Sequence, residues 1–299
     1  MSITRYKYFE KVARLGTIRE AAEALHVAPS AVSRQIAQLE YENDIALFER
    51  HARGMNLTSA GEILFAHARG LLDHHESARS EISDLKGLRR GEVRVWTIEG
   101  MVKDFVVPII ADFQEQYPGI LISLEVASTD LITNALMSDD ADIGILFNPQ
   151  SLRGLAVAAS VNDPLHVVVS PSHPAAALDK IRIEDLPNWR IALADETFGI
   201  RHILDQVTVE LNVEIIPSLL TNSIEALRSY ARSAKGIAIL TPLSVRQDVQ
   251  LGLLKAIPVV LPDHHTSSLK ICTRKDRTNA MATQKLLDTL SGAFEHIAP

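Results

Sequence analysis

The chain has 299 residues, of which 46% are hydrophobic and 22% charged, a composition typical of a globular protein. Its length fits two domains of about 150 residues or one large α/β domain. The single cysteine, Cys272, excludes an intramolecular disulfide and a cysteine-rich metal site. The first residues lack the apolar stretch of a secretion signal, and the chain lacks a run of about 18 apolar residues. We therefore expect a cytoplasmic protein that does not enter a membrane.

The net charge of −7 is unevenly distributed along the chain. Residues 1–90 hold 13 Lys/Arg and 12 Asp/Glu, whereas residues 91–299 hold 17 and 25. The acidity therefore belongs to the second part of the chain. It does not exclude nucleic-acid binding by the first part, because such binding depends on cations at the phosphates and not on the total charge.

The first 60 residues show the pattern of short helices. A first helix should end at Gly16, which favours a left-handed cap. Thr17 and Glu20 have the spacing of a capping box that opens a second helix over 18–25. Residues 26–28 form a turn, and Pro29 suits the first position of a third helix that runs to about residue 40. This pattern predicts a helix-turn-helix over about 18–37, although an ordinary αα-hairpin would look similar.

The outer face of the third helix distinguishes these two interpretations. It is polar and cationic, with no carboxylate before Glu40, whereas a solvated face in an acidic chain would more often carry glutamate. Residues 45–57 have apolar ends around a cationic tip, which indicates a tight hairpin, or wing. The residues expected to contact DNA are Thr17, Ser30, Ser33, Arg34, Gln38, Arg50 and Arg53.

A long helix is expected after the wing, with Ser59 and Glu62 as a second capping box. Its apolar stripe advances in alternating steps of four and three residues, which is typical of a coiled-coil seam. We therefore expect a homodimer. A single histidine in such a seam is better interpreted as a packed residue than as a pH switch. The expected seam consists of Leu64, Ala68, Leu71, His75, Ala78, Ile82 and Leu85.

After residues 88–91 the pattern changes to alternating strands and helices, which predicts open α/β sheets, two of them in about 200 residues. The expected strands are 93–96, 121–126, 143–147, 165–170, 190–194, 215–219 and 237–240. The expected helices are 102–117, 130–137, 200–211 and 224–234.

The residues of the first part resemble the DNA-binding domain of LysR-type transcriptional regulators. The resemblance rests on Gly16-Thr17, Ala21-Ala22-Glu23-Ala24-Leu25-His26-Val27, Ala31-Val32-Ser33-Arg34-Gln35-Ile36, Leu47-Phe48-Glu49-Arg50 and Leu57-Thr58-x-Ala60-Gly61. Weaker matches follow at Tyr117-Pro118, Ala141-Asp142-Ile143, Asp163-Pro164-Leu165 and Gly236-Ile237-Ala238.

This resemblance implies an α/β protein with an N-terminal all-α winged helix-turn-helix (1–58), a linker helix (59–88) and an effector-binding domain (89–299). The last would resemble periplasmic binding proteins, with lobe 1 at about 89–161 and 267–299 and lobe 2 at about 162–266. A small-molecule effector would bind between the lobes. The resemblance further implies binding to double-stranded promoter DNA, a homodimer that assembles into a tetramer, and contact with RNA polymerase.

Two departures from the family pattern bear on the sites. The recognition helix begins with Ala28-Pro29-Ser30 in place of Ser-Gln-Pro, so a glutamine that can reach a base edge is missing. Where many relatives place hydroxyls that hold an anion, this chain has Ile98, Glu99 and Gly100. Glu99 either points to solvent beside its own helix or faces the cleft and selects a neutral or cationic effector. The expected effector-binding residues are Ile98, Glu99, Gly100, Thr129, Phe147, Phe198, Asn222 and Ser223.

Other classes of protein fit less well. The sequence lacks the common phosphate-loop, dinucleotide, nucleophile-elbow and zinc-protease motifs, so we expect no enzyme and no cofactor. The adjacent pairs His74-His75 and His264-His265 are less suited to one metal ion than an i,i+4 pair, so we expect no metal. Cys272 lies in an apolar stretch without a resolving partner, which argues against a redox sensor. A solute-binding protein would not explain the first 60 residues.

Overall fold

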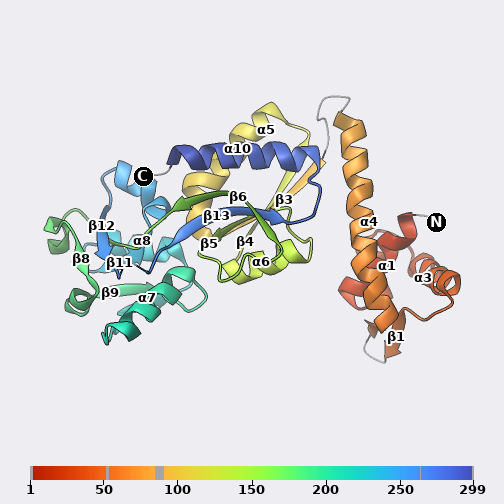
Figure 1. Ribbon diagram of the computed structural model, residues 1–299, viewed down its shortest axis with the longest axis horizontal. Helices are drawn as coiled ribbons and strands as arrows, with labels where there is room; N and C mark the ends of the chain where they lie inside the picture. The colour runs from red at the N-terminus through yellow and green to blue at the C-terminus, as the bar shows by residue number, and fades with distance from the viewer. Residues whose placement is uncertain (1–2, 52–53, 85–90, 263, 298–299) are drawn as a thin grey trace. The chain divides into compact units, whose positions relative to one another are not determined.

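A computed structural model describes residues 3–51, 54–84, 91–262 and 264–297 (Figure 1). The chain divides into two compact units, Met1–Ile82 and Ser83–Pro299, and each has its own hydrophobic core. Within the described ranges, we find no helix with the length and hydropathy needed to cross a membrane.

The first unit is a winged helix-turn-helix, as the sequence predicts. Its side chains Phe9, Val12, Val32, Ile36 and Leu39 have no exposed surface, so three helices close around one core. Gly16 adopts φ +74° and ends the first helix, and Pro29 begins the third. The elements are α1 (Ile3–Leu15), α2 (Ile18–Ala24), α3 (Pro29–Asn43), β1 (Phe48–His51), β2 (Gly54–Leu57) and α4 (Ser59–Asp84).

Hydrogen bonds from both sides hold the wing, which is the antiparallel pair β1–β2. The helix α3 runs to Asn43, beyond the expected end near residue 40. Its Glu40 carboxylate accepts from the backbone amides of Leu47 (2.9 Å) and Phe48 (3.2 Å). On the other strand, the Met55 amide donates to the Gly16 carbonyl at 2.7 Å. The wing is therefore tied to the helices that carry the side chains predicted to contact DNA.

The prediction that Ser59 caps α4 is wrong by one residue. The Gly61 amide donates to the hydroxyl of Thr58 at 3.1 Å, so Thr58 and not Ser59 caps α4. The Thr58 hydroxyl in turn donates to the Ala46 carbonyl at 2.8 Å. Only Thr58 is placed both before the first turn and against the start of the wing, and this tertiary contact selects it.

The first part of the expected dimer seam serves another purpose in the structure. Ala68 is 1% exposed and belongs to the core of the first unit, and the half-buried Leu64 packs against that core. Leu71, by contrast, is 47% exposed, Ala78 is exposed and His75 is half-buried. Leu85 lies outside the described residues, as does the side chain of Ile82. A seam between two chains stays a prediction for α4 beyond Ala68.

The second unit contains two sheets, in agreement with the expected two-lobed α/β architecture (Figure 1). In the five-stranded sheet of lobe 1, β3 runs parallel to β4 and β5, and β13 runs antiparallel to β5 and β6. The sheet has the order β4-β3-β5-β13-β6. Its strands are β3 (Gly91–Thr97), β4 (Ile120–Val126), β5 (Ile143–Phe147), β6 (Leu155–Asn162) and β13 (Ser268–Arg274). The associated helices are η1 (Glu99–Met101), η2 (Val102–Val106), α5 (Val107–Gln116), α6 (Thr129–Met137) and α10 (Met281–Ile297).

Lobe 2 holds a six-stranded sheet of order β10-β9-β11-β7-β12-β8. The chain enters it after β6 and leaves it before β13, so two connections join the lobes. The strands are β7 (His166–Val169), β8 (Ile181–Arg182), β9 (Ile191–Ala194), β10 (Leu219–Thr221), β11 (Ile237–Leu240) and β12 (Lys255–Val260). The helices are η3 (Pro174–Ala177), η4 (Ile183–Asn188), α7 (Gly199–Glu210), α8 (Ile224–Arg232), η5 (Leu243–Val245) and α9 (Arg246–Gln250).

Several elements differ from the sequence-based expectation, and β8, β12 and α10 were not among the expected elements. The strand expected at 215–219 begins only at Leu219, because Pro217 has no amide to donate to a neighbouring strand. The helix expected over 102–117 starts with a π-helical turn, η2, before it becomes α-helical at Val107. The strand β6 was not expected, because its small residues give a weak hydrophobic pattern.

Cys272 is completely buried in β13. Burial raises the pKa of its thiol to about 12, because a thiolate would lose its hydration there. The side chain therefore behaves as a small apolar residue, as the sequence indicates.

The close approach of α4 to the wing yields a stability prediction. A Cβ atom on Gly61 would lie 2.1 Å from the Leu47 carbonyl oxygen, so Gly61→Ala should destabilise the first unit by about 1–3 kcal/mol or more. Gly70 lies in the same helix with no atom within 4 Å of an added Cβ, and Gly70→Ala should be neutral or stabilising by up to about 1 kcal/mol. Thermal unfolding followed by far-UV circular dichroism compares the two. Equal melting temperatures would contradict the contact.

Candidate functional site

The outer face of α3 gathers the side chains predicted to contact DNA. Ser30 and Arg34 are exposed, and Ser33 and Gln38 are half-buried, while the opposite face of the helix fills the core. Among the described residues, no ion-pair partner is found for the Arg34 guanidinium. Gln38 donates to Glu42 at 3.1 Å. An exposed guanidinium for which the described residues supply no acidic partner suits an anionic ligand, and Glu42 is the nearest carboxylate on this face of α3 beyond Gln38.

Other predicted DNA contacts have different surroundings. The Thr17 hydroxyl accepts from the Glu20 amide (3.2 Å) and donates to the Glu20 carboxylate (3.0 Å). Thr17 thus caps α2 as expected, although the reciprocal bond runs between the side chains. Arg50 belongs to β1, but its side chain lies outside the described residues, as does the whole of Arg53.

A cavity of about 210 Å³ lies in the second unit and is lined by residues from both lobes. Seven of the eight residues predicted to bind an effector line it, all except Ser223. The lining residues are Ile98, Glu99, Gly100, Val126, Ala127, Ser128, Thr129, Phe147, Thr197, Phe198, Gly199, Ile200, Asn222, Ile224, Leu240, Thr241 and Ser244. Many of them follow the carboxyl ends of β3, β4, β5 and β9, which is where open α/β sheets place ligands.

The wall of the cavity is held by local contacts. The Thr129 hydroxyl accepts from the Phe147 amide (3.2 Å) and donates to the Phe147 carbonyl (3.1 Å), which joins α6 to β5. A Cβ on Gly199 would lie 2.8 Å from the Phe147 ring, so α7 starts close to that ring only because residue 199 is glycine. Sequence reasoning missed Thr197, Thr241 and Ser244, whose polarity alone does not separate them from other loop residues.

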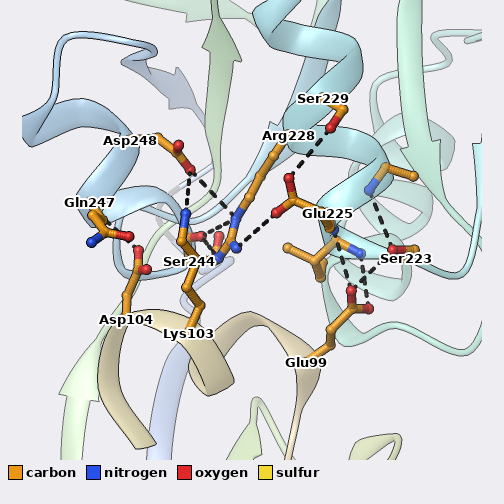
Figure 2. A network of polar contacts seen from close by, with 12 residues as sticks. Glu99, Lys103, Asp104, Ser223, Glu225, Arg228, Ser229, Ser244, Gln247 and Asp248 are labelled. Carbon is orange, nitrogen blue, oxygen red and sulfur yellow. Dashed lines mark hydrogen bonds and ion pairs between the residues drawn. The ribbon is translucent and has the colours of Figure 1, made fainter. Parts of the chain in front are cut away.

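Glu99 reaches from lobe 1 to lobe 2 and binds the first turn of α8 (Figure 2). Its carboxylate accepts from the Ser223 hydroxyl (3.1 Å) and from the backbone amides of Ile224 (2.9 Å) and Glu225 (3.3 Å). The hypothesis that Glu99 points to solvent and complements its own helix is therefore wrong. Ser223, which does not line the cavity, instead holds Glu99 and also caps α8 by accepting from the Ala226 amide at 3.3 Å.

A second set of polar contacts joins the lobes beside Glu99 (Figure 2). The Asp104 carboxylate, on η2 of lobe 1, accepts from the backbone amide of Gln247 in lobe 2 at 3.0 Å. The Lys103 ammonium lies 3.8 Å from the Asp248 carboxylate, which is buried and also binds Arg232 at 2.8 Å. One short segment of lobe 1 thus supplies both sets of contacts.

Two histidines and a glutamate converge away from this cavity. The Nε2 atoms of His264 and His265 lie 3.1 and 2.8 Å from one carboxylate oxygen of Glu210. The sequence suggested no such group, because Glu210 is 54 residues away from His264.

The described architecture defines a class of protein. The chain combines a winged helix-turn-helix with a two-lobed α/β unit that encloses a cavity. The outer helix face of the first carries an arginine for which the described residues supply no ion-pair partner. This combination is typical of a ligand-responsive DNA-binding regulator. Residues 86–295 match the LysR substrate binding domain, and residues 3–62 match the bacterial regulatory helix-turn-helix protein of the lysR family. The chain therefore belongs to the LysR family of transcriptional regulators and is not an enzyme.

Individual relatives agree with this assignment. The chain is 28% identical over 258 residues to the HTH-type transcriptional activator CmpR of Synechocystis sp., covering 86% of this chain and 84% of CmpR. A full-length OxyR variant from Pseudomonas aeruginosa has a similar fold, with a TM-score of 0.72, 20% identity, and coverage of 99% of this chain and 95% of OxyR. Full-length CbnR complexed with its target DNA gives a TM-score of 0.53 at 19% identity, covering 98% and 100% of the two chains.

Asp163 lies in the connection from β6 to β7, which is one crossing between the lobes, and contacts Ser267 in the other crossing. Its Oδ1 atom accepts from the Leu243 amide at 3.2 Å, and its carbonyl accepts from the Ser267 hydroxyl at 2.8 Å. Burial raises the pKa of its carboxyl to about 7, because the charged form loses its hydration.

This raised pKa predicts a pH-dependent stability. The folded state favours the protonated carboxyl, so the stability it contributes is present at low pH and is lost as pH rises from about 4 to about 7. The free energy of unfolding of the neutral Asp163→Asn variant, compared with that of the wild type, should therefore rise by roughly 2–3 kcal/mol as the pH is raised from 5 to 8. Urea unfolding followed by tryptophan fluorescence measures this, since both tryptophans, Trp96 and Trp189, lie in the second unit. A difference that does not change with pH would contradict the prediction.

Proposed function

We propose that α3 recognises an operator in the major groove and that the wing contacts the adjacent backbone. The unpaired, exposed Arg34 carries this proposal. A guanidinium can bind a guanine with two hydrogen bonds, and Ser30 and Ser33 can bond either base edges or phosphates. Thr17 is committed to its cap, and its hydroxyl can still accept a bond from outside. Arg50 and Arg53 are proposed as phosphate contacts on sequence grounds.

Two chains would pair through the exposed part of α4 beyond Ala68, where Leu71 and Ala78 offer apolar surface. Pairing would place two recognition helices about one DNA turn, ~34 Å, apart on a partly palindromic site. By analogy with the family, two such dimers form a tetramer that acts on RNA polymerase. Such pairing would let a unit with 10 Lys/Arg and 11 Asp/Glu bind DNA selectively, since two copies add their contacts.

We further propose that the cavity between the lobes binds the effector. Its volume of about 210 Å³ is below the usual range of roughly 300–1,000 Å³ for ligand pockets, so the effector is a small molecule. Because the lining comes from both lobes, a ligand there contacts both and has different affinities for different lobe arrangements. That difference in affinity is what allows it to change the DNA-bound state.

Replacing Arg34 tests the DNA interface. Arg34→Ala should weaken binding to the operator by about 1–3 kcal/mol and relax specificity at one position of each half-site. Binding to unrelated DNA should change little, because phosphate contacts supply most of it. Fluorescence anisotropy with operator and scrambled duplexes, at matched salt, measures both affinities. An equal loss for the two duplexes would identify Arg34 as a phosphate contact, and unchanged binding to the operator would contradict the proposed interface.

A further inference from the structure

The amino end of α8 is an anion-binding position that the chain fills with its own carboxylate. Backbone amides at a helix amino end are unpaired within the helix and favour negative charge. Here the Ile224 and Glu225 amides and the Ser223 hydroxyl all donate to Glu99 (Figure 2). Such charge-assisted bonds are stronger than bonds between neutral groups. A ligand carboxylate at this position would therefore compete with a tethered one.

The rest of the cavity offers no counter-charge to an acidic ligand. Among the described residues that line the cavity, Glu99 is the only charged one, and none is Lys, Arg or His. Most of the remaining wall is apolar. Among the described residues, the side chains of Ser128 and Asn222 have no hydrogen-bond partner, so they can bind a hydroxyl or carbonyl group.

We infer that Glu99 is a built-in ligand of lobe 2 that links the lobes and excludes acidic molecules as effectors, leaving small molecules without a carboxylate. This inference rests on the proposed function of the cavity as the effector site. An uncharged molecule fits beside Glu99 against Phe147 and Phe198 and is oriented by Ser128 and Asn222. An acidic molecule meets the Glu99 carboxylate at the wall and finds the α8 amides already bonded.

The experiment uses the full chain and sodium acetate as the probe, with sodium chloride at equal ionic strength as the reference. Tryptophan fluorescence reports thermal unfolding of the second unit alone, because the first unit contains no tryptophan. Glu99→Ala should lower the melting temperature by about 2–8 °C, and acetate should restore part of this loss. Wild type should respond to acetate no more than to chloride.

Two further variants separate charge from occupancy. Glu99→Gln keeps the side chain in place without its charge, so it should be destabilised and should not be rescued by acetate. Glu115→Ala, which removes an exposed glutamate of α5 in the same lobe, should match the wild type throughout.

Three results would overturn the inference: an unchanged melting temperature for Glu99→Ala, a destabilised Glu99→Ala that acetate does not rescue, or a wild type that acetate stabilises as strongly as it does the variant. None of these measurements involves DNA. Failure here therefore remains distinct from failure of the proposed DNA interface, which the Arg34 experiment tests.

An independent observation points to a metal site formed by Glu210, His264 and His265. Their three ligand atoms lie within 4.8 Å of one another. Two ligands of a tetrahedral zinc ion are about 3.3 Å apart, given bonds of about 2.0–2.1 Å. The observed 3.1 and 2.8 Å between each Nε2 and the Glu210 oxygen are hydrogen-bond distances somewhat shorter than that spacing, so an ion would enter after a small outward shift of these side chains. The adjacent histidines alone do not make the site; the carboxylate at the end of α7 completes it.

We propose that these residues bind Zn²⁺ or a similar divalent ion that prefers imidazole ligands. The histidines lie between β12 and β13, in a connection from lobe 2 to lobe 1. A bound ion would tie this connection to α7. The three residues are separate from those that line the effector cavity.

Cobalt(II) titration of the purified full chain tests the site, since tetrahedral cobalt absorbs strongly in the visible range. The wild type and His296→Ala, an exposed histidine of α10, should show one equivalent of tetrahedral cobalt, displaced by Zn²⁺. His265→Ala and Glu210→Gln should lose that absorption while circular dichroism stays unchanged. Absorption that persists in His265→Ala, or its absence in the wild type, would refute the site.

Discussion

The bond between the Glu99 carboxylate and the first turn of α8 is the contact on which the arrangement of the effector domain depends. Helix amides that are neither paired nor hydrated are costly, and in this domain a side chain of the opposite lobe satisfies them. The neighbouring contacts of Lys103 and Asp104 follow the same direction, from lobe 1 to lobe 2. The cavity exists where it does because these contacts hold its two walls together on one side.

Local sequence signals predicted the first unit well, because its helix ends are determined by neighbouring residues. Gly16 and Pro29 define a helix end and a helix start through their own backbone preferences. The cap of α4 was misplaced by one residue because Thr58 and Ser59 both carry a hydroxyl, and only the contact with the Ala46 carbonyl separates them. The same limit applied to Leu64 and Ala68, since helical spacing does not tell which core an apolar stripe joins.

In the second unit the sequence predicted the class of fold and most of the residues around the cavity, but not what they do there. Seven of the proposed residues line it, because the ends of strands can be recognised from hydrophobic patterns. The role of Glu99 could not be predicted, since Ser223, which it binds, is 124 residues away. The meeting of Glu210 with His264 and His265 is equally non-local. The strand β6 was not predicted for a different reason, since its small residues give a weak hydrophobic pattern.

The π-helical turn η2 relates Glu99 to the rest of lobe 1 in a further way. In this turn the Val107 amide donates to the Val102 carbonyl, so the turn holds one residue more than an α-helical turn. One residue corresponds to a rotation of about 100° around a helix axis. The extra residue therefore sets the angular phase of the segment before it relative to α5. A relative that lacks this residue would have a regular helix here, and its equivalent of Glu99 would face a different direction.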